Sequence, residues 1–349
     1  MVTIGTIAIG FFVMLGLMLT GLHVATVMFA TSILGLLVFF GPSILAPLGN
    51  MMWSELNSFI LTAIPLYVLM GELLVRSGIA ERMYNALALW MHRLPGGLLH
   101  TNVASSTMFA AISGSSVATA ATIGTVAFPT FRAQGYEERW VAGSIASGAT
   151  LGILIPPSIN FIIYGAISET SIGDLFLAGF VPGLLLAMLF MGTIAVAAVL
   201  RPQIAGRPDT EPSMAERLRK LVDLVPPLFI FVMIVGSIYQ GWATPTEAAA
   251  VGVVAALLLA ALNRRLSFAM LHVALLSTVR ITAMMLLILT TAFFLNFSMG
   301  LMGIPNAISS FITDLNVGPL TLIACLVLLY LALGCFLDSL AMMIATMPI

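Results

Sequence analysis

Long apolar runs alternate along most of the chain with short stretches that are polar or contain glycine and proline. Several runs reach the roughly 20 residues that a helix needs to cross the hydrocarbon core of a bilayer. Runs such as 184–200 are continuously apolar rather than alternating, so the pattern predicts helices and not the strands of a transmembrane β-barrel. The expected helices cover approximately residues 4–20, 23–42, 58–75, 142–167, 174–200, 222–240, 246–263 and 281–303.

Composition supports the same class of protein. Of the 349 residues, 60% are hydrophobic and 8% are charged, whereas a soluble domain carries about 25% charged residues. No soluble fold could bury that much apolar surface. The sequence therefore predicts an all-α polytopic membrane protein.

The basic residues predict how the helices are oriented. If the expected spans alternate across the bilayer, all 13 lysine and arginine residues fall on one side, including those of the 201–220 loop. The positive-inside rule assigns this side to the cytoplasm. We therefore expect a multi-pass membrane protein whose N-terminus lies outside the cytoplasm.

Residues 98–131 interrupt this pattern, because arginines near both ends place both ends on the cytoplasmic side. Small polar residues occupy the middle, at 113–116. The pattern predicts a re-entrant hairpin of two short helices that meet at this tip, where freed carbonyls and hydroxyls could bind a cation and a helix N-terminus could face an anion. The alternative is that these small residues only permit close helix packing.

The expected span 142–167 contains a second interruption, the Pro156–Pro157 pair. A proline inside a helix removes an amide donor and clashes with the preceding turn. The helix is therefore expected to unwind near 152–157 and to free carbonyl groups within the membrane. A simple kink is the alternative, but two interruptions in neighbouring segments favour a transport site.

Internal similarity suggests that one unit is used twice in opposite orientations. Residues 21–26 and 241–247 each join two apolar runs, and Ser116 has a counterpart near Asp338. Inverted repeats are typical of secondary transporters. The expected parts are a first repeat at 1–200, with scaffold helices in 1–75, the hairpin at 98–131 and the broken helix at 142–167, a cytoplasmic linker at 201–221, and an incomplete second repeat at 222–349 that ends inside a second hairpin.

Four motifs occur in order at 114–124, 152–158, 241–252 and 336–342. Together they resemble the large membrane subunit, or DctM-like M subunit, of tripartite ATP-independent periplasmic (TRAP) transporters. The resemblance implies a sodium-coupled elevator related to the ion transporter superfamily. It also implies a location in the bacterial inner membrane, so that the expected outer position of the N-terminus is periplasmic. Family members continue with a second proline-broken segment, so the sequence is expected to be truncated at its C-terminus or completed by another chain.

The resemblance also implies a set of site residues, carried over by position. The first sodium site would draw on the hairpin tip and the broken helix, and a second would begin in the second hairpin. The sodium-binding candidates are Ser113, Ser116, Gly152, Ile155, Pro157, Gly334 and Asp338. The substrate-binding candidates are Ser115, Thr119, Ser158, Asn160 and Ser339. Sodium is the coupling ion, and no other metal and no organic cofactor is expected.

The implied partners are a small four-helix membrane subunit, a periplasmic substrate-binding protein, membrane lipid and a carboxylate such as a C4-dicarboxylate or sialic acid, with no role for nucleic acid. A passive channel and a sodium/carboxylate symporter that needs no binding protein are the alternatives. An enzyme is not expected: Lys220 is the only lysine and lies outside any phosphate-binding loop, and Ser115 has no histidine base on a neighbouring span.

Three acids are expected at membrane depth, where a carboxylate is costly. Asp338 is the strongest candidate for an ion ligand, because it lies at the tip of the expected second hairpin; the alternative is that it only caps a helix. Glu247 is expected to cap the helix that follows Thr244. Glu72 is expected to pair with Arg76, four residues later on the same helix.

Overall fold

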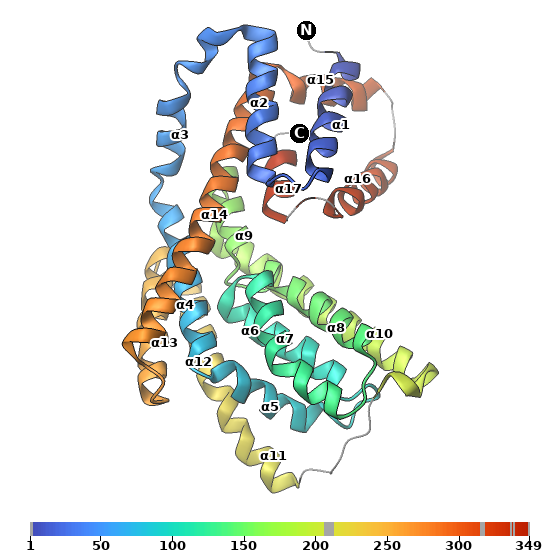
Figure 1. Ribbon diagram of the computed structural model, residues 1–349, viewed down its shortest axis with the longest axis vertical. Coiled ribbons are helices and arrows are strands. Elements are labelled where there is room, and N and C mark those ends of the chain that lie inside the picture. The colour runs from blue at the N-terminus through green and yellow to red at the C-terminus, as the bar shows by residue number, and fades with distance from the viewer. Residues whose placement is uncertain (1–2, 206–212, 315–317, 336, 338, 348–349) are drawn as a thin grey trace. The chain divides into compact units, whose positions relative to one another are not determined.

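The computed structural model describes residues 3–205, 213–314, 318–335, 337 and 339–347, and every regular element in these residues is a helix (Figure 1). The α-helices are α1 (Ile4–Leu19), α2 (Val24–Phe40), α3 (Leu48–Leu56), α4 (Ala63–Arg76), α5 (Ile79–Met91), α6 (Leu98–Ser113), α7 (Ser116–Ala133), α8 (Glu138–Thr150), α9 (Ile159–Ser168), α10 (Ile172–Leu200), α11 (Met214–Lys220), α12 (Val225–Tyr239), α13 (Pro245–Leu262), α14 (Phe268–Leu301), α15 (Ile304–Asp314), α16 (Pro319–Gly334) and α17 (Ser339–Thr346). Short 3-10 turns are η1 (Pro42–Leu45), η2 (Phe59–Thr62), η3 (Leu151–Ile153), η4 (Pro202–Ile204) and η5 (Leu221–Leu224).

The all-α polytopic class is confirmed. Within the described residues, five helical segments are long and apolar enough to cross a membrane. Each expected span has a helical counterpart, although α14 begins at Phe268, well before the predicted start at 281. The short helices α3, α5, α11 and α15 were not predicted, because their apolar stretches are too short to indicate a span.

The chain forms two compact units, which are Met1–Ser58 with Ala283–Ile349, and Phe59–Thr282. The first unit has a small core in which Leu36, Leu48 and Phe294 are buried. The ring of Phe29 lies 5.3 Å from that of Phe294. The second unit contains both the hairpin and the broken helix, and the following paragraphs concern it.

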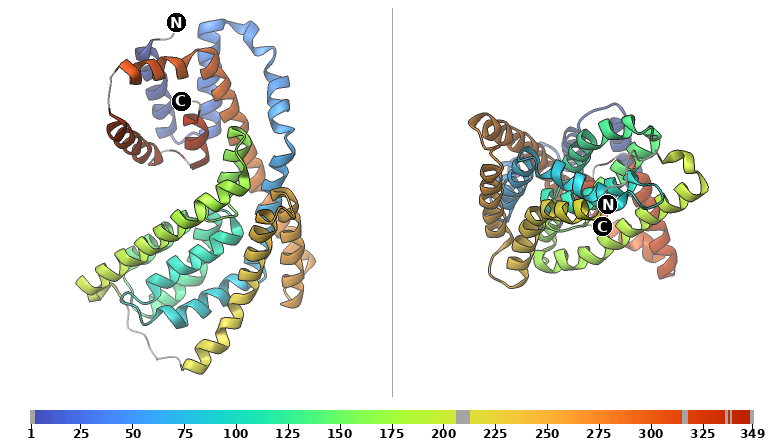
Figure 2. Two further views of the ribbon diagram at one scale, coloured as in Figure 1. Left: turned by 180° about the vertical axis from the view of Figure 1, so that it is seen from behind. Right: turned by 90° about the horizontal axis from the view of Figure 1, so that it is seen from below.

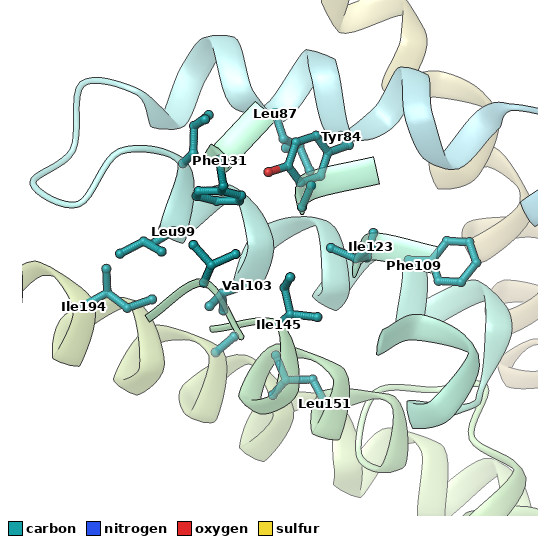
Figure 3. Packing of buried hydrophobic residues seen from close by; sticks show 14 of the residues in the cluster. Tyr84, Leu87, Leu99, Val103, Phe109, Ile123, Phe131, Ile145, Leu151 and Ile194 are labelled. Atoms are coloured by element: carbon teal, nitrogen blue, oxygen red, sulfur yellow. The ribbon is translucent and has the colours of Figure 1, made fainter. Parts of the chain in front are cut away.

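Helix α6 lies at the centre of the second unit. It contacts α5, α7, α8 and α10, and its residues are almost all buried (Figure 2). The apolar core includes Leu99 and Val103 of α6, with Ile123, Ile145 and Ile194 contributed by α7, α8 and α10 (Figure 3). Burial on every side explains why α6 shows no amphipathic pattern in the sequence.

A chain of hydrogen bonds runs through this core from α5 to α8. The Tyr84 hydroxyl donates to Asn102 Oδ1 at 3.0 Å, and Asn102 Nδ2 donates to Ser144 Oγ at 2.8 Å. Ser144 Oγ in turn donates to the Val141 carbonyl at 2.9 Å. Hydrogen bonds between helices stabilise packing where water is absent. The hairpin and the first half of the broken helix are therefore joined by polar as well as apolar contacts.

Tyr136 fixes the base of the hairpin. Its hydroxyl accepts a hydrogen bond from the Leu98 amide at 3.1 Å, where α6 begins. Its ring packs edge-to-face on Phe131 near the end of α7, with 4.8 Å between ring centroids. Burial raises the pKa of Tyr136, and the bond from the Leu98 amide lowers it by a smaller amount. The phenol is therefore protonated near neutral pH.

Two of the three acids have the local partners that the sequence predicts. Arg76 Nη2 lies 2.9 Å from Glu72 Oε2. Glu247 and Thr244 form a reciprocal capping box at the start of α13, in which the Thr244 amide donates to Glu247 Oε2 at 2.8 Å. Both carboxylates therefore have structural roles. The third acid, Asp338, lies outside the described residues.

Candidate functional site

The predicted hairpin tip is a sharp turn between two antiparallel helices. Helix α6 ends at Ser113, Gly114 adopts a left-handed conformation with φ of 60°, and α7 begins at Ser116. Ser115 caps α7, because its hydroxyl accepts a hydrogen bond from the Ala118 amide at 3.3 Å. The prediction of two short helices that meet at this tip is confirmed.

Hydroxyl groups stiffen the inside of the turn. The Thr119 hydroxyl donates to the Ser115 carbonyl at 2.7 Å, which uses its only proton. Ser113 Oγ lies 3.0 Å from Thr119 Oγ1 and 3.5 Å from the Ser115 carbonyl oxygen. Ser113 and Thr119 are both buried. Their hydroxyl groups hold the two helix ends together, and the Ser113 oxygen keeps lone pairs for a further ligand.

The predicted break in the second segment is also present. Helix α8 ends at Thr150 and is followed by η3, the cis-linked Pro156–Pro157 pair and α9. Within the break, the Ile155 amide donates to the Leu151 carbonyl at 2.8 Å. The Ser158 hydroxyl, which is buried at the start of α9, donates to the Ile153 carbonyl at 2.7 Å. These local hydrogen bonds stabilise the irregular backbone between α8 and α9.

The tip and the break touch through their backbones. A Cβ at Gly114 would lie 2.7 Å from the Pro157 carbonyl oxygen, and one at Gly152 would lie 3.3 Å from the Ser116 amide nitrogen. Only glycine leaves room for such close approach. The starts of α7 and α9 are thus brought to one place. Asn160 lies in the first turn of α9.

The second group of predicted residues lies in the other compact unit. Gly334 is exposed at the end of α16, and Ser339 begins α17. Asp338 lies outside the described residues. The structure therefore brings together the candidates of the first hairpin and broken helix, at Ser113, Ser115, Ser116, Thr119, Gly152, Pro157 and Ser158, with Ile155 and Asn160 in the same segment.

Three further glycines support this site and were not predicted. A Cβ at Gly71 of α4 would lie 3.2 Å from Ser113 Cα. On α10, a Cβ at Gly179 would lie 2.6 Å from the Leu154 carbonyl oxygen, and one at Gly183 would lie 2.7 Å from Ile155 Cγ1. The Gly-x-x-x-Gly spacing of the α10 pair is a known signal for close helix approach, and it could have identified this surface.

The chemistry of the site is that of backbone groups and hydroxyls. The described residues contain no cluster of three or more histidine, cysteine or acidic side chains that could hold a metal ion. What the site offers is carbonyl and hydroxyl oxygens, which suit a hard cation, and two helix N-termini, which suit an anion.

Comparison with known proteins gives the family of the chain. Residues 11–349 match the family described as the DctM component of the tripartite ATP-independent periplasmic transporter. The chain belongs to this DctM family. The resemblance inferred from the four motifs is therefore confirmed over nearly the whole chain.

Individual DctM relatives differ in what their names say they transport. The C4-dicarboxylate TRAP transporter large permease protein DctM of Pseudomonas aeruginosa is 32% identical over 314 residues, which cover 90% of this chain and 73% of that protein. The ectoine/5-hydroxyectoine large permease UehC of Ruegeria pomeroyi is 32% identical over 344 residues, covering 97% and 79%. The sialic acid large permease SiaM of Vibrio cholerae is 32% identical over 298 residues, covering 85% and 69%.

Membership of the DctM family, together with the apolar helices, makes this chain a multi-pass inner-membrane subunit of a TRAP transporter. Its relatives are permease subunits and not enzymes.

Proposed function

We propose that this chain imports a small organic anion with a carboxylate group, in symport with sodium, and that the hairpin tip and the helix break form its first binding region. The observation that carries the proposal is the contact of Gly114 with the Pro157 carbonyl. Two independent interruptions of helical structure meet there, inside the packed core of one unit. Irregular backbone at membrane depth is tolerated only where it is buried in protein or lines a water-filled cavity.

Two helix N-termini support binding of the carboxylate. Helix α7, with 18 residues, and α9, with 10 residues, both begin at this contact. The N-terminus of a helix carries a partial positive charge and unpaired amide groups. The three relatives named above transport a C4-dicarboxylate, sialic acid or an ectoine, and all of these carry a carboxylate. Ser115, Thr119, Ser158 and Asn160 remain the proposed substrate contacts in this region, and Ser339 is a separate proposed contact in the other compact unit.

Oxygen atoms around the same turn support binding of sodium. The Ser113 hydroxyl oxygen has two lone pairs, so it keeps acceptor capacity beside its hydrogen bond with Thr119. The break from Gly152 to Pro157 interrupts the helical bonding of its carbonyls. We assign the first sodium to Ser113, Ser116, Gly152, Ile155 and Pro157. Gly334 and Asp338 are proposed to begin a second sodium site.

The packing of the second unit supports an elevator mechanism. Helices α6, α7 and α8 contact one another, and the Asn102–Ser144 bond joins α6 to α8. The hairpin and the broken helix would therefore move together as one body. The proposed partners are a periplasmic binding protein, which delivers the substrate, and a small four-helix membrane subunit. We further propose that the N-terminus is periplasmic.

Reconstitution of the complete transporter in proteoliposomes tests this function. Labelled succinate, sialic acid and ectoine are offered with the cognate binding protein, with and without an inward sodium gradient. We expect uptake of one substrate that requires both. Flux without a gradient would indicate a passive channel, and full uptake without the binding protein would indicate an independent symporter.

A matched pair of variants tests the location of the site. Ser116→Trp places a large ring at the tip–break contact and should abolish uptake. Gly124→Trp is the control on the same helix, because a Cβ at Gly124 meets nothing within 4 Å. Unchanged sodium-dependent uptake by Ser116→Trp would show that the tip is not part of the binding site.

A further inference from the structure

A groove runs between α8 and α10 on the second unit, where the two helices lie side by side in both views (Figures 1 and 2). Its volume is about 320 Å³, at the lower end of the range of small-molecule sites. Arg139, Trp140 and Ser147 line it from α8, and Phe190 and Thr193 line it from α10. It is separate from the tip and the break, none of whose candidate residues lines it.

The groove combines a cationic end with apolar walls. The Arg139 side chain is exposed, and none of the ion pairs among the described residues includes it. Its neighbour Arg132 is paired instead with Glu138, at 3.1 Å. An anion that enters the groove would therefore meet a guanidinium group that is in none of these ion pairs. Phe190 and the indole of Trp140 provide apolar surface beside it.

The groove lies near one end of α10, a helix long and apolar enough to cross a membrane. Helix α10 is a candidate membrane span. Thr193 precedes the end of this helix at Leu200 by seven residues, which corresponds to about 10 Å at 1.5 Å per residue. Trp140 is of the type that gathers at membrane interfaces. In the proposed orientation, this end of α10 and Arg139 both lie on the cytoplasmic side.

We propose that the groove binds an anionic phospholipid of the cytoplasmic leaflet. The phosphate lies on Arg139, the Ser147 and Thr193 hydroxyls face the glycerol region, and an acyl chain lies along Phe190. Basic pockets between membrane helices on the cytoplasmic side are suited to such headgroups. The proposal rests on the orientation proposed above, but it does not depend on sodium coupling or on the identity of the substrate.

Lipid binding to the purified complete transporter tests the proposal. The protein in detergent is mixed with phosphatidylglycerol or phosphatidylcholine, and retained lipid is measured by native mass spectrometry. We expect selective retention of phosphatidylglycerol, reduced about fivefold by Arg139→Gln, as the loss of one basic residue near a membrane surface predicts. Arg132→Gln is the matched control and should retain the lipid. Equal effects of the two substitutions would overturn the proposal.

A second pair of variants fills the groove without changing charge. Gly143 lines the groove, and a Cβ there meets nothing within 4 Å, so Gly143→Leu occupies open space. It should displace phosphatidylglycerol, whereas Gly192→Leu, also in open space but outside the groove, should not. Retention by Gly143→Leu would overturn the proposal. Competition by inorganic phosphate as strong as by the lipid would show a soluble-anion site instead.

If Arg139→Gln and Gly143→Leu lose lipid binding but keep normal uptake, the proposed transport function is unaffected. Absence of sodium-dependent uptake by the unmodified transporter, with normal retention of phosphatidylglycerol, would instead count against the transport proposal. Measuring both properties on the same preparations therefore separates failure of the lipid proposal from failure of the transport proposal.

Discussion

The α-carbon of Gly114 faces the carbonyl oxygen of Pro157 so closely that a Cβ would lie 2.7 Å from it. The first residue turns the hairpin, and the second lies in the broken helix, 43 positions later in the sequence. The contact is made between backbones, so neither helix can be displaced locally without the other. It also gives the most direct structural test of the site.

Gly114→Ala should disrupt the site. The left-handed φ of 60° costs an L-residue roughly 1–2 kcal/mol, and the new methyl group would also press on a backbone oxygen that cannot rotate away. We expect a lower melting temperature of the purified transporter and loss of most sodium-dependent uptake. Gly124→Ala, in open space on α7, should behave like the unmodified protein. Equal uptake by the two variants would contradict a close tip–break contact.

A double-mutant cycle should detect coupling between Asn102 and Ser144. Their side chains share a 2.8 Å hydrogen bond in the core, and such bonds in membrane proteins contribute roughly 0.5–1.5 kcal/mol. We expect Asn102→Ala and Ser144→Ala to be non-additive by about this amount in reversible unfolding. Ser147 is the control, because its hydroxyl bonds to the carbonyl of Gly143 on its own helix. The effect of Ser147→Ala on the free energy of unfolding should simply add to the effect of Asn102→Ala.

Tyr136→Phe should loosen the base of the hairpin. The substitution keeps the ring on Phe131 but removes the acceptor of the buried Leu98 amide. An unsatisfied buried donor costs about 1–3 kcal/mol. Hydrogen exchange at the start of α6 should therefore become faster. Tyr239→Phe, at a partly exposed position at the end of α12, should leave exchange in α6 unchanged, and a similar increase there would argue against a local effect.

Cysteine labelling should report the orientation of the chain. Cys325 and Cys335 are free and exposed, so both are first replaced by serine. Trp242→Cys lies at a side chain that is 81% exposed, in the turn before α13, and Met214→Cys begins α11. A membrane-impermeant maleimide applied to spheroplasts should label the first and reach the second only after lysis. The reverse result would invert the proposed topology.

Much of the second unit could be predicted from local signals. The proline pair required a break in 142–167, and the Ser113 to Ser116 stretch indicated a turn between short helices; both features are present. Glu247 and Thr244 form the expected capping box because its geometry depends only on residues three apart. These features are determined within one or two helical turns, so a single sequence is enough to find them.

The remaining features depend on contacts between distant segments. The approach of Gly71 to Ser113, and that of Gly179 to the Leu154 carbonyl, are made between helices far apart in the chain. A glycine in the sequence does not show which distant segment of backbone packs against it. The assignment of residues to sodium or substrate stays a prediction for a related reason. Carbonyl ligands belong to the backbone, which every residue has, so residue type does not show which carbonyl binds an ion.

Helix α4 has two unlike faces at adjacent positions. The Met70 sulfur fills the space where a Cβ of Gly252 on α13 would lie, only 2.5 Å away, whereas Gly71 presents bare backbone to Ser113 of α6. At the first contact a side chain occupies the space beside the glycine, and at the second contact two backbones lie close together. If the hairpin slides, as the proposed elevator mechanism requires, we expect less resistance at the second contact than at the first. We therefore propose that α4 stays with α13 during such a movement, and that the sliding surface lies between Gly71 and Ser113.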